Sequence, residues 1–430
     1  MSIKHFVNGV SALVLAGALG VAATSSAQAT EGYFQTGYGT KQKALSGAGV
    51  AHSEDAMSLS VNPAGLVSVG NQFNAAFTLF SPHRDVEVGT PGFLPSGKHT
   101  SGSTMFLMPN MAYSRQIDAQ SAWGVAVFGN GGMNTDWSAM TGGAMCPAPG
   151  MGLFCGGKAG VNLEQMFVSV GYARRMGGLS VGVAPVMALQ KFRADGLSMF
   201  GAMGASSDAA NLSNRGDDWA YGAGVRVGVE WTLQPGLRLG LSGSTPIWST
   251  KFERYSGLFA DGGGFDIPAN VTLGVAWDVT PTVTLMADYR HIFYGGVGSI
   301  ANSSTAMAPG AGNLGLAGGP GFGWKDVDVI ALAAAWKASQ DLTLRVGYSH
   351  NTNPVQKADV MFNIFAPGVV TDHFSGGLSY QLTKNSGIDL AAAWVPRNSV
   401  SGQSLAVMGG QDLKLSMEQY ELSLGYSYKF

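Results

Sequence analysis

The chain ends in the stretch YELSLGYSYKF, residues 420–430, in which large apolar side chains alternate with small or polar ones. Because successive side chains of a β-strand point to opposite faces, this stretch predicts a strand with one apolar face and one polar face. The apolar face carries Tyr420, Leu422, Leu424, Tyr426, Tyr428 and Phe430.

The same alternation recurs along the chain beyond residue 70. Clear examples lie at residues 219–231, 237–241, 283–290 and 342–348. Alternation alone would also fit a soluble sandwich, whose polar face meets water. In these segments, however, aromatic residues gather near the strand ends, as they do in the interfacial girdles of membrane barrels.

The connections between these segments alternate between short and long. Short turns at one end and long loops at the other are typical of an outer-membrane barrel, and their number predicts about fourteen antiparallel strands. An even number places both ends of the barrel on the periplasmic side, and closure leaves no exposed strand edge. The short turns lie at 118–121, 177–178, 234–236, 280–281, 339–341 and 384–386, and the long loops at 89–103, 138–161, 197–217, 256–266, 300–325, 359–370 and 405–412.

The composition excludes the other large classes of protein. Only 12% of the residues are charged, 46% are apolar and 63 are Gly. This charged share is about half of that in a soluble domain. A helical membrane protein would show unbroken apolar runs of roughly 18 residues, and none follows the N-terminus. The sequence therefore predicts an all-β transmembrane barrel in the outer membrane of a Gram-negative bacterium, where such barrels carry a terminal aromatic residue like Phe430.

The N-terminus predicts export. Lys4 precedes an apolar run over residues 10–23, and residues 27–29 (AQA) form an A-x-A cleavage site. This is the layout of a secretory signal peptide, which we predict over residues 1–29. An N-terminal membrane anchor is the alternative, but the apolar run is short and no stop-transfer charges follow it.

Residues 30–70 do not share the alternation of the predicted barrel, residues 71–430. This segment is rich in Gly, Ala and Ser. It is interpreted either as a disordered periplasmic tail or as a plug inside the barrel lumen.

The two cysteines, Cys146 and Cys155, lie close together in a segment rich in Gly, Pro and Met. In an exported protein such a pair predicts a disulfide, and a cysteine pair without a nearby His is a poor zinc site. We predict no metal and no cofactor. The net charge of −2 gives no reason to expect a nucleic-acid partner.

Two matches to catalytic motifs fail on their context. Residues 92–99 approach a phosphate-binding loop, but His99 stands where Ser or Thr is required and no helix follows. Residues 178–182 match G-x-S-x-G, but the predicted strand continues where that motif needs a sharp turn and a helix. The chain is therefore predicted not to be an enzyme.

Several short stretches, in order along the chain, carry a resemblance to a known family. Together with the terminal Phe430, they make the chain similar to the FadL family of outer-membrane transporters for long-chain fatty acids and aromatic hydrocarbons. The stretches are ALSGAGVA at 44–51, EDA at 54–56, NPA at 62–64, PNM at 109–111, LEQM at 163–166, and the run from WKD at 324–326 to PV at 354–355.

The resemblance implies a fourteen-stranded barrel whose lumen is closed by an N-terminal hatch, residues 30–70. The hatch motif would be Asn62, Pro63 and Ala64. Substrate would land on an extracellular groove, reach an internal pocket and leave sideways through a wall opening beside the hatch motif. A kink in the third strand, here at Gly129, Asn130, Gly131 and Gly132, would create that opening. Glycines inside a strand favour a kink independently, although an ordinary glycine-rich strand end is the alternative.

The resemblance also places a hydrophobic groove on two extracellular loops, where exposed apolar side chains indicate a ligand surface. Basic residues of the lumen are candidates for binding a carboxylate, although they could instead pair with acidic residues, as Arg226 could with Glu230. The groove candidates are Leu197, Met199, Phe200, Met203, Leu258 and Phe259, and the basic candidates are Lys191, Arg193, Arg226 and Arg238.

The predicted function is passive uptake of hydrophobic molecules, first of all long-chain fatty acids, by lateral diffusion through the barrel wall. Neutral aromatic or aliphatic hydrocarbons are the alternative substrates, and an outer-membrane enzyme or adhesin is a second alternative. A hydrophilic porin is disfavoured by the few charges and the hatch-like segment. We expect a monomer that contacts outer-membrane lipid, lipopolysaccharide and the barrel assembly machinery.

Overall fold

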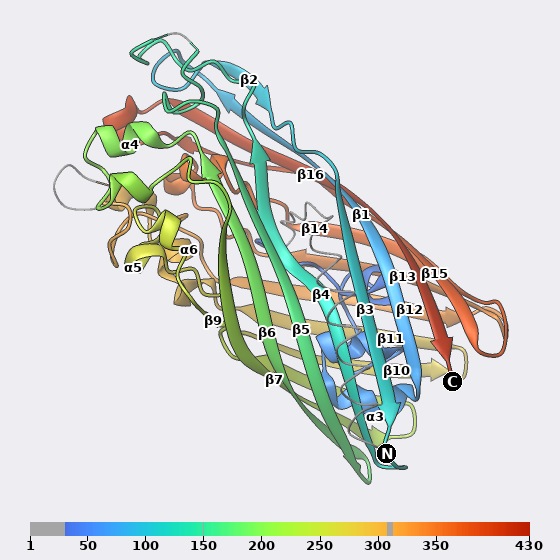
Figure 1. The fold of residues 1–430 in the computed structure, drawn as a ribbon. Coiled ribbons are helices and arrows are strands. Elements are labelled where there is room, and N and C mark those ends of the chain that lie inside the picture. The colour runs from blue at the N-terminus through green and yellow to red at the C-terminus, as the bar shows by residue number, and fades with distance from the viewer. Residues whose placement is uncertain (1–30, 149, 308–312) are drawn as a thin grey trace.

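The computed structural model describes residues 31–148, 150–307 and 313–430. The predicted signal peptide, residues 1–29, lies outside the described residues. Fourteen of the described strands form a closed antiparallel barrel (Figure 1), as the sequence predicted. The last strand closes the barrel by pairing with the first, from Gln72–Lys429 to Val88–Leu413.

The bounds of the wall strands agree with the predicted alternation of short turns and long loops. Each strand pairs with the next wall strand along the chain. The wall consists of β1 (Gln72–Val88), β3 (Phe106–Gln116), β4 (Ser121–Asp136), β5 (Gly160–Met176), β6 (Leu179–Asp195), β7 (Asp218–Gln234), β8 (Leu237–Ser244), β10 (Asn270–Thr280), β11 (Val283–Ile292), β12 (Val327–Lys337), β13 (Leu342–Asn351), β14 (Asp372–Gln381), β15 (Ser386–Gln403) and β16 (Asp412–Lys429).

The long connections carry short elements of their own. Strand β2 (Gly97–Thr100) pairs with β1 inside the segment predicted to be a plain loop at 89–103, and β9 (Trp248–Ser249) pairs with β7. Loop helices are α4 (Ser198–Ala202), α5 (Ala260–Gly263) and α6 (Gly298–Ala301), with 3-10 turns η3 (Ala209–Asn211), η4 (Glu253–Tyr255), η5 (Tyr294–Gly296), η6 (Ser304–Ala306), η7 (Lys357–Asp359), η8 (Phe362–Ile364) and η9 (Ala406–Met408).

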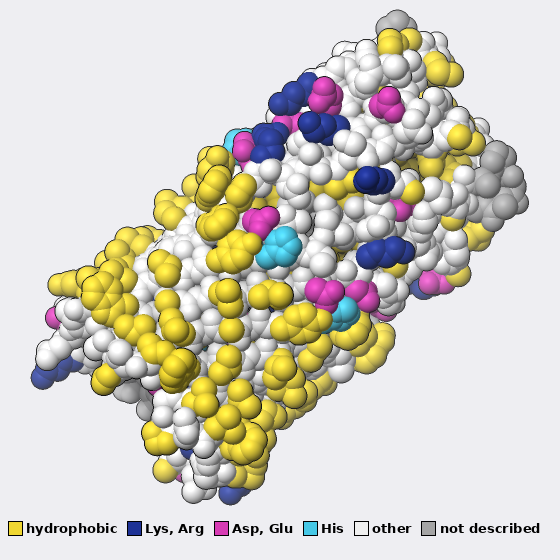
Figure 2. Space-filling model, turned by 180° about the vertical axis from the view of Figure 1, so that it is seen from behind, with side chains coloured by type: hydrophobic (Ala, Val, Ile, Leu, Met, Phe, Trp, Pro, Cys, Tyr) yellow, Lys and Arg dark blue, Asp and Glu magenta, His cyan; other side chains and the backbone are white. Residues whose placement is uncertain are grey.

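The outer face of the wall is apolar, as contact with lipid requires. On β16, Leu422 and Leu424 are 58% and 53% exposed, whereas Ser423 between them is 1% exposed and faces the lumen. Figure 2 shows hydrophobic side chains over a broad part of the outer surface, with charged side chains gathered beyond its border. Within the described residues, no helix is long and apolar enough to cross a membrane.

Residues 31–70, hereafter the N-terminal segment, lie inside the barrel (Figure 1). Small residues of the wall make room for them. A Cβ on Gly228 of β7, for example, would lie 1.9 Å from Asn62 Oδ1, so a glycine is needed at this contact. The elements of the segment are α2 (Thr40–Ala44), η1 (Ala56–Ser60), η2 (Pro63–Gly65) and α3 (Leu66–Val69).

Candidate transport pathway

An apolar cavity lies at the end of the barrel that carries the long loops, which in such barrels is the extracellular end. The cavity is narrow in this structure, with a volume of about 50 Å³. Among the described residues that line it, none is charged. Its aromatic lining is Phe154, Phe192, Phe200, Phe259, Phe322, Phe362 and Phe365.

Four of the six predicted groove residues line this cavity: Leu197, Phe200, Leu258 and Phe259. The other two do not. Met199 is partly buried against the neighbouring core, and Met203 is 50% exposed. Met199 lies in the short helix α4 and Met203 directly follows it, whereas Phe200 is the residue of this helix that lines the cavity.

Several cavity residues come from loops that the sequence analysis did not implicate, and Phe322 of the β11–β12 connection is one of them. Phe154 follows β4, whereas Phe362 and Phe365 precede β14. The Phe154 ring centroid lies 5.6 Å from that of Phe200 and 5.3 Å from that of Phe365. Cys146 and Cys155 form a disulfide within the Phe154 loop, and Cys155 is buried. The predicted disulfide is therefore present and closes the loop that carries Phe154.

Strand β4 has a bulge at the predicted kink. Its pairing with β5 shifts register between Gly129 and Gly131, which leaves Asn130 as the extra residue. Its ladder to β3 ends at the pair Asn110–Phe128, while β4 continues along β5 to Asp136. The part of the wall between residues 106–109 of β3 and 129–135 of β4 therefore lacks ladder pairing, and we call it the β3–β4 seam.

The N-terminal segment covers the bulge from inside the barrel. The Gln35 amide donates to Asn130 O at 3.1 Å, and the Gly132 amide donates to Tyr33 O at 3.2 Å. A Cβ on Gly131 would lie 1.7 Å from Tyr33 O, so the two backbones meet only because this residue is glycine. The Asn130 side chain is fully buried and accepts a 2.8 Å hydrogen bond from Tyr38 Oη.

The Asn62-Pro63-Ala64 motif lies elsewhere, against β6 and β7. The Asn62 side chain caps η2 by accepting from the Ala64 amide at 3.1 Å, and its Nδ2 donates to Val50 O at 2.8 Å and Val229 O at 3.0 Å. The expectation that this motif lies beside the kink is therefore wrong for this chain. Residues 33–38 occupy that place instead.

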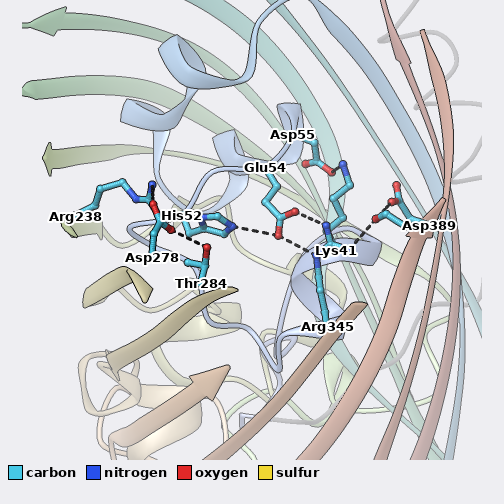
Figure 3. A network of polar contacts seen from close by, with 10 residues as sticks. Lys41, His52, Glu54, Asp55, Arg238, Asp278, Thr284, Arg345 and Asp389 are labelled. Carbon is cyan, nitrogen blue, oxygen red and sulfur yellow. Dashed lines mark hydrogen bonds and ion pairs between the residues drawn. The ribbon is translucent and has the colours of Figure 1, made fainter. Parts of the chain in front are cut away.

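A polar network ties the middle of the N-terminal segment to the wall (Figure 3). Arg345 of β13 donates to both carboxylate oxygens of Glu54, with its Nε at 2.9 Å from Oε1. Lys41 and Asp55, both in the segment, form an ion pair at 3.5 Å. Burial alone would raise the pKa of Glu54, but the Arg345 guanidinium and His52 hold it well below its usual range. Glu54 therefore anchors the segment to β13 as an ionised group at neutral pH.

Further ion pairs hold the start of the segment. Lys43 Nζ lies 2.6 Å from Glu421 of β16, and Arg290 of β11 donates to Glu31 at 2.7 Å. Glu31 is 1% exposed, and this burial raises its pKa to about 7, although Arg290 opposes the rise. The start of the segment therefore carries a carboxyl group that titrates near neutral pH.

Two of the four predicted lumen cations do not face the lumen. Lys191 and Arg193 share the strand face of the exposed Val183 and Met187, on the outside of β6. The inward Phe192 between them fixes this orientation because side chains alternate along a strand. Outside the lumen, Lys191 pairs with Glu164 at 2.8 Å, and Arg193 pairs with Asp195 at 2.7 Å.

The other two predicted cations, Arg226 and Arg238, do lie on the lumen face. The suggested pair between Arg226 and Glu230 does not form. Arg226 donates to Ser60 O of the N-terminal segment and to Ser244 Oγ, and Glu230 accepts from Ser53 Oγ at 2.6 Å. Arg238 forms a two-fold contact with Asp278, at 2.9 and 3.1 Å.

A closed antiparallel barrel with an apolar outer face and long loops at one end is an outer-membrane β-barrel. The family model for the outer membrane protein transport protein family (OMPP1/FadL/TodX) matches residues 17–430, and the chain belongs to this family. It is therefore an outer-membrane transport protein and not an enzyme. This confirms the resemblance that the sequence motifs indicated.

Solved structures share the fold at low sequence identity. The Pseudomonas putida toluene transporter TodX is 20% identical, with a TM-score of 0.67 over 92% of this chain and 99% of its own. The Ralstonia pickettii toluene transporter TbuX is 18% identical, with a TM-score of 0.63 over 92% and 99%. A Pseudomonas aeruginosa FadL homologue is 14% identical, with a TM-score of 0.66 over 95% and 100%.

A sequence relative matches over a shorter length. A putative outer membrane protein of Neisseria meningitidis serogroup B is 25% identical over 114 residues. These residues are 25% of this chain and 24% of that protein, so the match spans about a quarter of the relative's length.

Proposed function

We propose that this protein mediates passive uptake of hydrophobic molecules, first of all long-chain fatty acids, from the apolar cavity through the β3–β4 seam into the membrane. The observation that carries the proposal is the position of strand β4, which touches both places. Thr135 at the end of the seam donates to Phe365 O at 3.1 Å, and Phe365 lines the cavity. On this proposal, a molecule that leaves the cavity would follow β4 to the seam.

The N-terminal segment is the proposed hatch. It crosses the lumen, is held by ion pairs to β11, β13 and β16, and contacts the bulge through residues 33–36. We propose residues 30–70 as the hatch, 71–430 as the barrel and 1–29 as a cleaved signal peptide. Displacement of residues 33–36 from the bulge would open the seam while the anchors keep the rest of the hatch in place.

The driving force would be the hydrophobic effect. Transfer of a ligand from water into the cavity and then into lipid gains about 0.8 kcal/mol for each CH₂ that is buried. The route therefore needs no nucleotide or ion gradient, and uptake would follow the concentration gradient.

Neutral aromatic hydrocarbons are a second candidate substrate class. The cavity has seven phenylalanines and no charged residue among its described lining, so it offers no obvious partner for a carboxylate. Two of the solved structures with this fold are described as toluene transporters.

One experiment addresses both candidates. Ligands that co-purify with the detergent-extracted protein are identified by mass spectrometry, and binding of oleate and toluene is then measured by calorimetry. Bound long-chain acids would support fatty acid uptake, and a preference for toluene would support the hydrocarbon alternative. Binding of neither would contradict hydrophobic uptake itself.

A further inference from the structure

Arg84 of β1 is a buried cation without an acidic partner. It lies on the lumen face with Phe80 and Val86, and it is 3% exposed. Within the described residues, no Asp or Glu forms an ion pair with it, and the residues outside the described ranges include no Asp or Glu at all. A buried charge is costly unless it is paired, so this arrangement needs a reason.

The contacts of Arg84 are few and mostly apolar. Its Nη2 donates to Ser103 O at 3.0 Å, and the guanidinium lies 5.7 Å from the centroid of the Phe106 ring. Within the described residues its Nε has no hydrogen-bond partner, and the lumen-facing residue opposite it on β16 is Met417. At least one donor of the guanidinium is therefore free to bind an acceptor that the barrel does not supply.

Three other lumen arginines differ from Arg84 in this respect, and a fourth, Arg238, also has an Nε without a partner among the described residues but carries a charge paired with Asp278 of β10. Arg345 binds Glu54 and Arg290 binds Glu31, so both charges are neutralised by the hatch. Arg226 pairs with no acidic residue among those described, but it donates to Ser60 O of the hatch and to Ser244 Oγ. These three arginines hold the hatch, whereas Arg84 contacts only the wall.

Arg84 lies at the loop-side border of the β3–β4 seam. Its acceptor, Ser103, belongs to the segment that leads from β2 to β3, and the Gly102 amide joins this segment to Asp136 at the end of β4 at 2.8 Å. Phe106 is the first residue of β3, and the ladder between β3 and β4 starts four residues later, at Asn110. A separate apolar cluster of Phe80, Phe106 and Met108 continues along the seam.

We propose that Arg84 binds the carboxylate of a long-chain monocarboxylic acid at the seam, with the apolar tail against Phe80, Phe106 and Met108. The inference rests on the proposed function and makes Arg84 the residue that distinguishes acids from neutral hydrocarbons. A guanidinium in apolar surroundings binds a carboxylate through charge-assisted hydrogen bonds, which are stronger there than in water. The uncharged cavity would then accept the tail, and discrimination would follow at the seam.

The test compares two ligands that share one tail. Binding of oleate and of oleyl alcohol to the detergent-extracted full chain is measured at the same pH for the wild type, Arg84→Met and Arg84→Lys. The matched control is Arg397→Met, because Arg397 lies on the outer face and pairs with Asp85, the residue next to Arg84. Cooperative thermal unfolding checks that each variant is folded.

Arg84→Met should weaken oleate binding about tenfold or more and change oleyl alcohol binding less than twofold. Arg84→Lys should keep most of the preference for the acid, and Arg397→Met should change neither ligand. Removal of an unpaired buried charge should not lower the unfolding temperature. If Arg84→Met nevertheless fails to fold, Arg84→Gln, which keeps a donor for Ser103 O, takes its place with the same expected loss.

Other results would overturn the inference. Wild-type oleate affinity in Arg84→Met, or an equal loss for both ligands, would show that Arg84 does not bind the carboxylate. Wild-type protein that binds oleyl alcohol but not oleate would refute the inference and leave hydrophobic uptake standing. Wild-type protein that binds neither ligand would refute both.

Discussion

At the residue scale, Gly131 and Glu31 control how the start of the hatch meets the wall. Gly131 lets the backbone of Tyr33 approach the β4 bulge, because a Cβ at this position would lie 1.7 Å from Tyr33 O. Glu31, which precedes Tyr33 by two residues in the hatch, binds Arg290 of β11. The contact at Gly131 is steric, so it should respond to an added side chain. The contact at Glu31 is electrostatic, so it should respond to pH.

Gly131→Ala should displace residues 33–36 from the bulge, with Gly129→Ala as its control. A Cβ on Gly129 would lie 3.3 Å from the end of the flexible Gln35 side chain and 3.8 Å from Gln165 O, so it needs no shift of the backbone. We expect Gly131→Ala to cost about 1–3 kcal/mol, the usual cost of overpacking, and to raise amide exchange at Gln35, which donates to Asn130 O. Unchanged exchange at Gln35 in Gly131→Ala would show that the hatch does not dock there.

The folded start of the hatch should lose stability as the pH rises, because burial opposes the ionisation of Glu31 more than Arg290 favours it. Burial raises the pKa of Glu31 in the folded state from 4.5 to about 7. A raised carboxyl pKa contributes stability that is complete below about pH 4.5 and is lost as the pH rises through about 7, by about 3 kcal/mol in total at about 1.4 kcal/mol per pKa unit. Limited proteolysis of residues 31–38 should therefore be faster at pH 8 than at pH 6, relative to Glu31→Gln at each pH. A constant ratio between the two proteins would contradict this.

Strand parity was enough to orient some basic residues and not others. Lys191 and Arg193 alternate with Phe192 and share a face with Val183, so their outward direction was available from the sequence. The sequence did not predict that Arg84 is unpaired, because this depends on which strands flank β1 and on which of their residues face the lumen. A sequence gives the face of a side chain more readily than its partners.

At the scale of elements, the hatch and strand β4 form one unit. The bulge was predictable from the glycines at 129–132, because glycine in a strand interior commonly marks one. The contact of the bulge with residues 33–38 of the hatch was not predictable, since residues 31–38 have no alternation that would predict pairing. The Asn62-Pro63-Ala64 motif is better explained as the cap of η2, because the Asn62 side chain accepts from the Ala64 amide and donates to Val50 O of the hatch and Val229 O of β7.

Deletion of residues 31–70 should open the lumen to small polar solutes. The segment fills the space between wall strands, and its removal also leaves Arg290 and Arg345 of the lumen face without their carboxylate partners. Leak of a small sugar from proteoliposomes should rise at least several-fold over the full chain, for barrels shown to be folded by circular dichroism. An unchanged leak in a folded deletion variant would mean that the segment is not a plug.

At the scale of the whole molecule, the barrel was predictable because its rules are periodic. Two-residue alternation follows from contact with lipid on one face of each wall strand, and short turns alternate with long loops from one strand to the next. The cavity was only half predictable, because loops have no such period. Leu197, Phe200, Leu258 and Phe259 come from two loops, whereas Phe154, Phe362 and Phe365 come from loops that meet them only in the closed barrel.

The whole pathway leads to a prediction about chain length. If the cavity binds ligands by burial of apolar surface, the Kd of saturated fatty acids should fall about fourfold per added CH₂, the equivalent of about 0.8 kcal/mol, until the tail fills the space. Leu258→Ser, which places a hydroxyl in the lining, should weaken every member of the series, whereas Met203→Ser, outside the lining, should weaken none. Uptake into liposomes should show the same order without nucleotide or an ion gradient. A Kd independent of chain length would mean that the cavity does not hold the tail, and an equal effect of the two serine variants would place the binding surface on the outer loops instead.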